Sequence, residues 1–251
     1  FYKNVYYIVI GRYYSATQLG QYTRAEQFST IFSSNLTSVV QRVSYPVLSS
    51  IQEEPERLRD AYRKIIKVTM LITFALMFGL AAIAKPLIVI LIGEKWLMAV
   101  PFLQIICFSE MLYPLHAINL NILQVRGYSG LFLKLEIVKK IIAVIPIMIG
   151  IFWGINYMLW GAVCISLVSY ILNSYYSGRL IDYSTVKQVK DIFPCFLVSS
   201  LVALLMWGIT FLHFNFLVTL LLQVSVGILL AIVAYERMRL EEYKEIRRII
   251  L

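Results

Sequence analysis

Two arginines and an asparagine share one face of a long helix that is predicted over residues 18–51. At 100° per residue, Arg24, Asn35 and Arg42 fall within about 20° of one another, and Gln27 and Ser38 lie within about 60° of that line. Arg24 and Arg42 are about 27 Å apart along the helix axis, which is most of the thickness of a bilayer. Charged side chains at membrane depth usually face a bundle interior or a water-filled cavity. The stripe therefore predicts a helix that lines such a cavity.

Each arginine also has an interfacial interpretation. Arg24 would pair with Glu26 or extend to the outer headgroups, and Arg42 would extend to the cytoplasmic headgroups. In that case the two cations anchor the helix at both membrane borders and bind no ligand.

Further ionisable residues lie on two other predicted helices. Glu110, near the middle of the helix over 97–125, would neutralise an arginine, bind a proton or cation used for coupling, or serve as a structural partner of a neighbouring helix. Lys139 and Lys140 lie deeper than Lys134 in the helix over 131–152, within reach of an anionic headgroup. The helix that carries Glu110 also carries several uncharged polar residues, His116, Asn119, Asn121 and Gln124.

The composition predicts the kind of molecule that positions these residues. Of the 251 residues 60% are hydrophobic and 15% are charged, whereas soluble domains are about 45–50% apolar and about 25% charged. We expect an all-α, polytopic transmembrane bundle in contact with the lipid bilayer. The net charge of +9 is explained by basic cytoplasmic loops, so no nucleic acid is expected as a partner. The three cysteines form no CxxC pair, and no metal or other cofactor is predicted.

About eight stretches are predicted as membrane segments. They cover residues 5–10, 18–51, 65–92, 97–125, 131–152, 157–180, 192–212 and 214–235, and Pro86 is expected to kink or break the third. Lys and Arg gather in the loops after the even-numbered segments, so the positive-inside rule places both chain ends in the cytoplasm. The sequence at 53–67 is predicted as a basic amphipathic helix, and 236–251 as a similar tail. The external loops are very short, which leaves no catalytic domain outside the membrane and argues against an enzyme.

Four ordered motifs between residues 6 and 140 resemble a known family. They read GRYYSATQLGQYTRAEQF, VSYPVLSSIQEEPERLRDAYRKIIK, LIGEKWLMAVPFLQII and ILQVRGYSGLFLKLEIVKK. In this order they resemble the carboxy-terminal half of Wzx-type polysaccharide flippases of the MOP exporter superfamily, in the group for colanic acid, lipopolysaccharide and teichuronic acid. Beyond residue 140 the resemblance depends on hydropathy.

This resemblance implies a multi-pass protein of the bacterial inner membrane that translocates an undecaprenyl-diphosphate-linked oligosaccharide for lipopolysaccharide or exopolysaccharide biosynthesis. Residues 1–180 would form a MATE-like second lobe of about six segments, and 181–251 two trailing helices with a basic tail. The implied partners are the lipid-linked oligosaccharide, a missing amino-terminal lobe and a polysaccharide polymerase complex. The stripe, with Lys139 and Lys140, would then bind the diphosphate.

Three other functions stay open. A MATE-like exporter of drugs or cations would share the fold but would need an acidic or apolar cavity, and only Glu110 favours it. A polymerase, ligase or glycosyltransferase acting on lipid-linked sugars would need catalytic carboxylates or histidines. A scaffold for a polysaccharide assembly complex would transport nothing. No phosphate-binding loop is present, which argues against direct ATP use.

Overall fold

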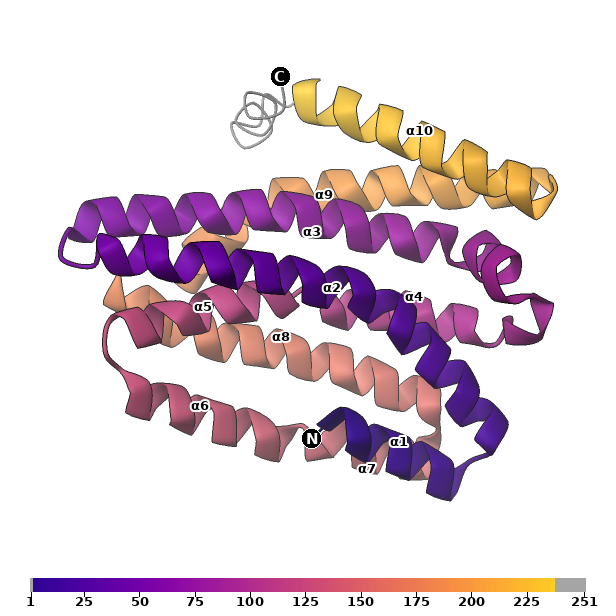
Figure 1. Cartoon of the computed structure of the whole chain (residues 1–251), viewed down its shortest axis with the longest axis horizontal. Coiled ribbons are helices and arrows are strands. Elements are labelled where there is room, and N and C mark those ends of the chain that lie inside the picture. The colour runs from indigo at the N-terminus through magenta and orange to yellow at the C-terminus, as the bar shows by residue number, and fades with distance from the viewer. Residues whose placement is uncertain (1, 238–251) are drawn as a thin grey trace.

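The computed structural model describes residues 2–237, with side chains from residue 5 onward, and these residues form helices and short connections without a strand. Most of the helices run along the long axis of the molecule (Figure 1). The helices are α1 (Tyr2–Tyr13), α2 (Ala16–Ser50), α3 (Pro55–Ile92), α4 (Ala99–Glu110), α5 (Tyr113–Val125), α6 (Ser129–Ile142), α7 (Val144–Trp153), α8 (Ile155–Leu180), α9 (Thr185–Gly208) and α10 (Phe216–Arg237), with 3-10 turns η1 (Glu94–Trp96) and η2 (Ile209–Leu212). The predicted all-α bundle is confirmed.

Each of the eight predicted segments has a helical counterpart in the structure. In chain order the counterparts are α1, α2, α3, α4 with α5, α6 with α7, α8, α9 and α10. Four helical stretches of the described chain are long and apolar enough to cross a membrane, namely α3, α8, α9 with η2, and α10. The number of spans and the cytoplasmic location of both ends remain predictions. The expected basic helix at 53–67 is continuous with the third segment in α3. The expected basic tail, from residue 238 on, lies outside the described residues.

Two segments that were predicted as continuous helices are each divided. A break at Met111 and Leu112 separates α4 from α5, and Ala143 separates α6 from α7. A proline follows each break within the first turn of the next helix, Pro114 in α5 and Pro146 in α7. Proline is well suited to a first helical turn, because its missing N–H would have no intrahelical partner there. The breaks therefore coincide with prolines that begin a new helix.

Of the kink or break expected at Pro86, the break is wrong, because α3 continues through this residue to Ile92. The kink remains a prediction. Pro86 is buried, and the surrounding turns pack against neighbouring helices. Tertiary packing thus holds the helix together at a position where local preference would end it.

Helix α3 forms the centre of the packing. Its buried side chains include Tyr62, Ile66, Met70, Phe74 and Met77. It contacts α2, α4, α5, α9 and α10, and the two trailing helices α9 and α10 lie along one edge of the molecule (Figure 1). Helices α6 and α7, with α1, lie along the opposite edge. The predicted division near residue 180 remains a prediction.

A clamp of three polar side chains ties α9 to α3. The guanidinium of Arg63 donates two hydrogen bonds to the carboxylate of Asp191, at 2.6 and 2.7 Å. The hydroxyl of Tyr183 donates a third to the same carboxylate, at 2.6 Å. Bidentate arginine–carboxylate pairs of this kind fix geometry as well as adding energy. The clamp therefore sets how α9 lies against α3.

Candidate functional site

Helix α2 packs through a face of small polar residues. Ser29, Ser33, Thr37 and Ser44 are all buried, with at most 5% of their surface exposed. Small side chains allow the close approach of α2 to α4 and α5, and small residues are typical of helix interfaces in membranes. These small residues therefore allow α2 to pack closely against the bundle although the helix is polar.

The opposite face of α2 carries the predicted stripe, and its five members are exposed. Arg24 donates a hydrogen bond to Gln27 Oε1 at 2.9 Å, and its guanidinium carbon lies 5.4 Å from the centre of the Trp96 ring. Asn35 and Ser38 donate to main-chain carbonyls of their own helix. The shared face is as the sequence predicts, but it points away from the rest of the described chain instead of into it.

The two arginines differ in their surroundings. Arg24 is held by Gln27 and Trp96 at the level of η1, and not by Glu26, which is buried on the other side of α2 and accepts a hydrogen bond from Tyr7. Arg42 forms no hydrogen bond or ion pair within the described part of the chain. Arg42 therefore keeps its charge available to a ligand, and Arg24 has local partners.

Glu110 ends α4 at the helix break. Its Oε2 accepts a hydrogen bond from Ser33 Oγ at 2.5 Å, so the carboxylate lies against the buried face of α2. The arginines are on the opposite face. This position favours a structural partnership between α4 and α2 over neutralisation of Arg24 or Arg42.

A pocket of about 430 Å³ lies between α2, α5, α6 and α8. Its polar and charged lining comprises Thr37, Gln41, Tyr113, His116, Asn121, Gln124, Glu136, Lys139, Lys140 and Ser169. Tyr113 is the first residue of α5, and Ala143, which also lines the pocket, separates α6 from α7. The pocket thus lies at both helix breaks. Interrupted helices are a recurrent feature of binding sites in membrane transporters.

This polar pocket has a charged end and an amide end. Because α5 and α6 form a hairpin, the last turn of α6 lies at the level of the first turn of α5 (Figure 1). Lys139 and Lys140 therefore lie near the breaks, where Lys139 forms an ion pair with Glu136. Gln124 and Phe132 lie nearer the α5–α6 turn. The two lysines outnumber the single carboxylate of the pocket, which suits an anionic ligand.

His116 forms part of the pocket wall and is already hydrogen-bonded. Its Nε2 lies 3.2 Å from Ser166 Oγ, and that hydroxyl donates to the Ser109 carbonyl at 3.0 Å. Since the hydroxyl has a single hydrogen, Nε2 must be the donor, and Nδ1 then accepts from Asn173 Nδ2 at 3.5 Å. These bonds assign a neutral imidazole that connects α5 to α4 and α8.

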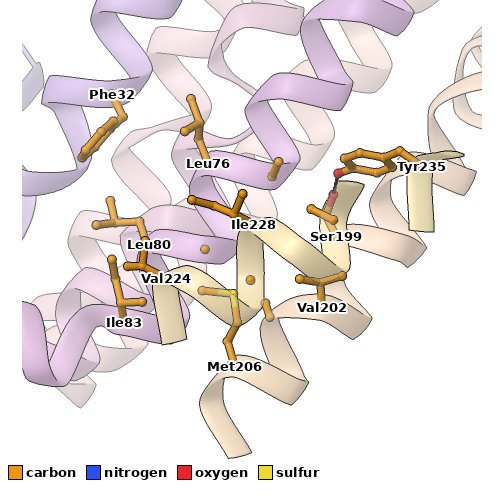
Figure 2. Close-up of a pocket in the computed structure, with 15 residues that line it drawn as sticks. Phe32, Leu76, Leu80, Ile83, Ser199, Val202, Met206, Val224, Ile228 and Tyr235 are labelled. Atoms are coloured by element: carbon orange, nitrogen blue, oxygen red, sulfur yellow. Dashed lines mark hydrogen bonds between the residues drawn. The ribbon is translucent and has the colours of Figure 1, made fainter. Parts of the chain in front are cut away.

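A second pocket, of about 300 Å³, is an apolar groove between α3, α9 and α10, with Phe32 of α2 at one side (Figure 2). Its two hydroxyl groups, on Ser199 and Tyr235, are hydrogen-bonded to each other at 2.8 Å. The other labelled residues are Leu76, Leu80, Ile83, Val202, Met206, Val224 and Ile228, which are all apolar. This apolar groove suits a hydrocarbon chain.

The sequence identified half of the polar and charged residues of the pocket without bringing them together. Lys139, Lys140, His116, Asn121 and Gln124 all line it, whereas Asn119 turns away to accept hydrogen bonds from Tyr62 and Ser177. Gln41 and Glu136 were not predicted as site residues. The two prolines that follow the helix breaks were the available signal for the location.

Comparisons with known proteins agree with this fold. A family model described as polysaccharide biosynthesis protein matches residues 1–101. The chain is 25% identical over 227 residues to the teichuronic acid biosynthesis protein TuaB of Bacillus subtilis (strain 168), covering 89% of this chain and 47% of TuaB. It is 25% identical over 147 residues to the lipopolysaccharide biosynthesis protein WzxC of Escherichia coli (strain K12), covering 59% and 30%. It is 31% identical over 103 residues to the succinoglycan biosynthesis transport protein ExoT of Rhizobium meliloti (strain 1021), covering 41% and 21%.

The fold is similar to part of a solved flippase structure. The structure of lipid II flippase MurJ in an inward closed conformation superposes with a TM-score of 0.68 at 14% identity, over 92% of this chain and 50% of MurJ. The chain spans about half the length, or less, of the relatives that it matches. The resemblance to Wzx-type polysaccharide biosynthesis proteins is confirmed. The chain is a multi-pass protein of the bacterial inner membrane.

Proposed function

We propose that this chain translocates undecaprenyl-diphosphate-linked oligosaccharides across the bacterial inner membrane, as the second lobe of a polysaccharide flippase. The names of the relatives and the likeness to a flippase fold support this class of substrate. The observation that carries the proposal is the polar pocket at the two helix breaks, where Lys139 and Lys140 face a space of about 430 Å³. The diphosphate is the anionic part of such a lipid, and the two lysines would bind it.

The remaining features fit the same substrate. The exposed stripe of α2 offers Arg24 and Arg42, with Gln27, Asn35 and Ser38 between or beside them, to an anionic headgroup that crosses the membrane. An amino-terminal lobe that faces α2 would close a cavity over this stripe, in line with the missing half of the relatives' length. The apolar groove beside α10 suits the hydrocarbon tail. A polysaccharide polymerase complex is a further proposed partner.

The proposed activity is transport, without a covalent step. A MATE-like exporter of cations is disfavoured, because the polar pocket holds two lysines and one glutamate. A membrane polymerase, ligase or glycosyltransferase would form or break a glycosidic or phosphate bond, and the same assay tests this alternative. Glu110, at the break beside Ser33, is proposed as a structural partner of α2 and as the candidate for ion coupling.

The test uses the complete gene product in a strain that lacks its own copy of the gene. Lys139 and Lys140 are replaced together, by alanine in one variant and by arginine in another. We expect the alanine variant to reduce surface polysaccharide by at least tenfold and to accumulate lipid-linked oligosaccharide at the cytoplasmic face, because two cations at the proposed diphosphate site are lost. The arginine variant keeps both charges and should retain most export.

Lys134→Ala is the matched control, since Lys134 lies on the same helix but does not line the pocket. Membrane abundance is measured for every variant. Full export by the alanine variant at normal abundance would contradict the proposal. Accumulation of a shortened oligosaccharide, with transport intact, would favour the enzyme instead.

A further inference from the structure

We propose that the amide end of the polar pocket binds the first sugar ring attached to the diphosphate, and so determines which oligosaccharide the protein accepts. This inference rests on the proposed function and assigns a separate task to the half of the pocket nearer the α5–α6 turn. It concerns Gln41, Asn121 and Gln124 with the ring of Phe132.

The three amides keep hydrogen-bonding groups for a ligand. Gln41 and Gln124 are exposed to the pocket, and their side chains form no hydrogen bond with other described residues. Asn121 is 6% exposed, and its Nδ2 donates to Ser44 Oγ at 2.9 Å. That bond orients the amide, and its Oδ1 accepts no hydrogen bond from the described residues. Each amide offers both a donor and an acceptor, which matches neighbouring hydroxyl groups of a sugar.

Phe132 supplies the apolar part of the same end. It lines the pocket from α6 and is partly exposed there. A sugar ring has polar edges and an apolar face, so a site with amides on one wall and an aromatic ring on another complements both. An ion or an unsubstituted phosphate has no apolar surface that could pack against this ring.

The order of groups along the pocket follows the order of groups in the substrate. Phe132 precedes Lys140 by eight residues of α6, which is about 12 Å along the helix axis. A diphosphate at the lysines therefore places its attached sugar toward the amides and Phe132. A volume of about 430 Å³ is at the small end of ligand sites, which span about 300–1,000 Å³. The pocket thus has room for the headgroup and an adjoining ring, and not for a long oligosaccharide.

Binding to the purified complete gene product in detergent tests this assignment with two probes. One probe is lipid-linked oligosaccharide extracted from membranes of the source bacterium that lacks this gene. The other is undecaprenyl diphosphate, which carries no sugar. The protein variants are the double variant Gln41→Ala with Gln124→Ala, and the double variant Lys139→Ala with Lys140→Ala. Gln18→Ala is the matched control, because it removes the same kind of side chain from α2 outside the pocket.

We expect the unchanged protein to bind the sugar-bearing lipid at least tenfold more tightly than undecaprenyl diphosphate, since a pair of well-placed hydrogen bonds contributes about tenfold or more. The glutamine double variant should bind both probes equally, with its affinity for undecaprenyl diphosphate unchanged. The lysine double variant should lose affinity for both. Gln18→Ala should behave as the unchanged protein.

Any other outcome contradicts either the sugar assignment or the proposed function. If the glutamine double variant keeps the preference for the sugar-bearing lipid, or if the unchanged protein has none, the sugar assignment is wrong and the diphosphate site stands. If the unchanged protein binds neither probe, the proposed function itself fails. Gln41 and Gln124 are exposed, so their truncation leaves the packing of the fold intact.

Discussion

The polar pocket and the apolar groove differ in how their walls are built. The polar pocket lies where two predicted segments are each divided into two helices, at Met111–Leu112 and at Ala143. The apolar groove lies between α3, α9 and α10, which are continuous alongside it. A break frees main-chain groups, and in a membrane such irregular backbone is tolerated only where it lines a cavity or is buried in protein. Polar chemistry is therefore concentrated at the breaks, and the unbroken helices offer a surface for lipid.

The largest expected effect comes from placing the same charge in each pocket. Leu80 is 4% exposed in the apolar groove, and Leu80→Asp should destabilise the protein by at least ~3 kcal/mol or prevent its accumulation, because an unpaired charge would be buried. Gln124→Asp puts the carboxylate in the polar pocket and should leave folding nearly unchanged. Thermal unfolding in detergent measures both. If the two variants unfold at the same temperature, the polar pocket and the apolar groove do not differ as proposed.

A second comparison separates the two arginines of α2. Arg42→Ala should lower polysaccharide export about tenfold, as expected for the loss of one charge-assisted contact. Arg24→Ala should lower it only two- to threefold (about 0.5 kcal/mol), since its guanidinium already contacts Gln27 and Trp96. Lysine at either position should restore most of the export. Export that is unaffected in both alanine variants would identify the arginines as interfacial anchors.

The clamp between α3 and α9 should matter to the apolar groove and not to the polar pocket. Arg63→Ala removes both hydrogen bonds to Asp191, and we expect a loss of about 1 kcal/mol because the arginine side chain is half exposed. Arg57→Ala breaks an exposed pair with Glu54 and should change stability by less than about 0.5 kcal/mol. Thermal unfolding compares the two variants. A larger effect for Arg57 would show that the clamp does not hold α9.

The smallest effect concerns a glycine that lines the apolar groove from α3. No heavy atom lies within 4 Å of the position that a Cβ on Gly79 would occupy. Gly79→Ala should therefore stabilise the protein by about 0.5–1 kcal/mol through helix propensity. At Gly227 across the groove, an added Cβ would lie 2.5 Å from Met206 Sδ, so Gly227→Ala requires the methionine to move and should bring no gain. Destabilisation by Gly79→Ala would mean that the groove is more tightly filled than described.

Periodicity and hydropathy predicted the all-α bundle, because long apolar stretches have few other structures in a membrane. The common face of Arg24, Asn35 and Arg42 was also predictable, since it depends only on helix geometry. The helix breaks, in contrast, were not predictable from the sequence. Six prolines lie in the predicted segments at positions where local preference alone cannot tell a break from a tolerated proline, and Pro101, in the first turn of α4, is one of them. The other five are Pro46, Pro86, Pro114, Pro146 and Pro194.

The polar pocket could be predicted only in part for a related reason. The sequence places His116, Asn121 and Gln124 on one helix but cannot say which other helices face them. The pocket depends on bringing α2, α5, α6 and α8 together, and contacts between distant segments decide that arrangement. Gln41 illustrates this limit. It is next to Arg42 in the sequence, but Gln41 lines the pocket whereas Arg42 lies on the exposed stripe of α2.

The most direct test of this account is a structure of the complete gene product with bound undecaprenyl diphosphate. We predict that the diphosphate lies in the polar pocket, with its oxygens within hydrogen-bonding distance of the Nζ atoms of Lys139 and Lys140. A diphosphate bound elsewhere, with the space between α2, α5, α6 and α8 empty, would contradict the central claim that the two helix breaks build the substrate site.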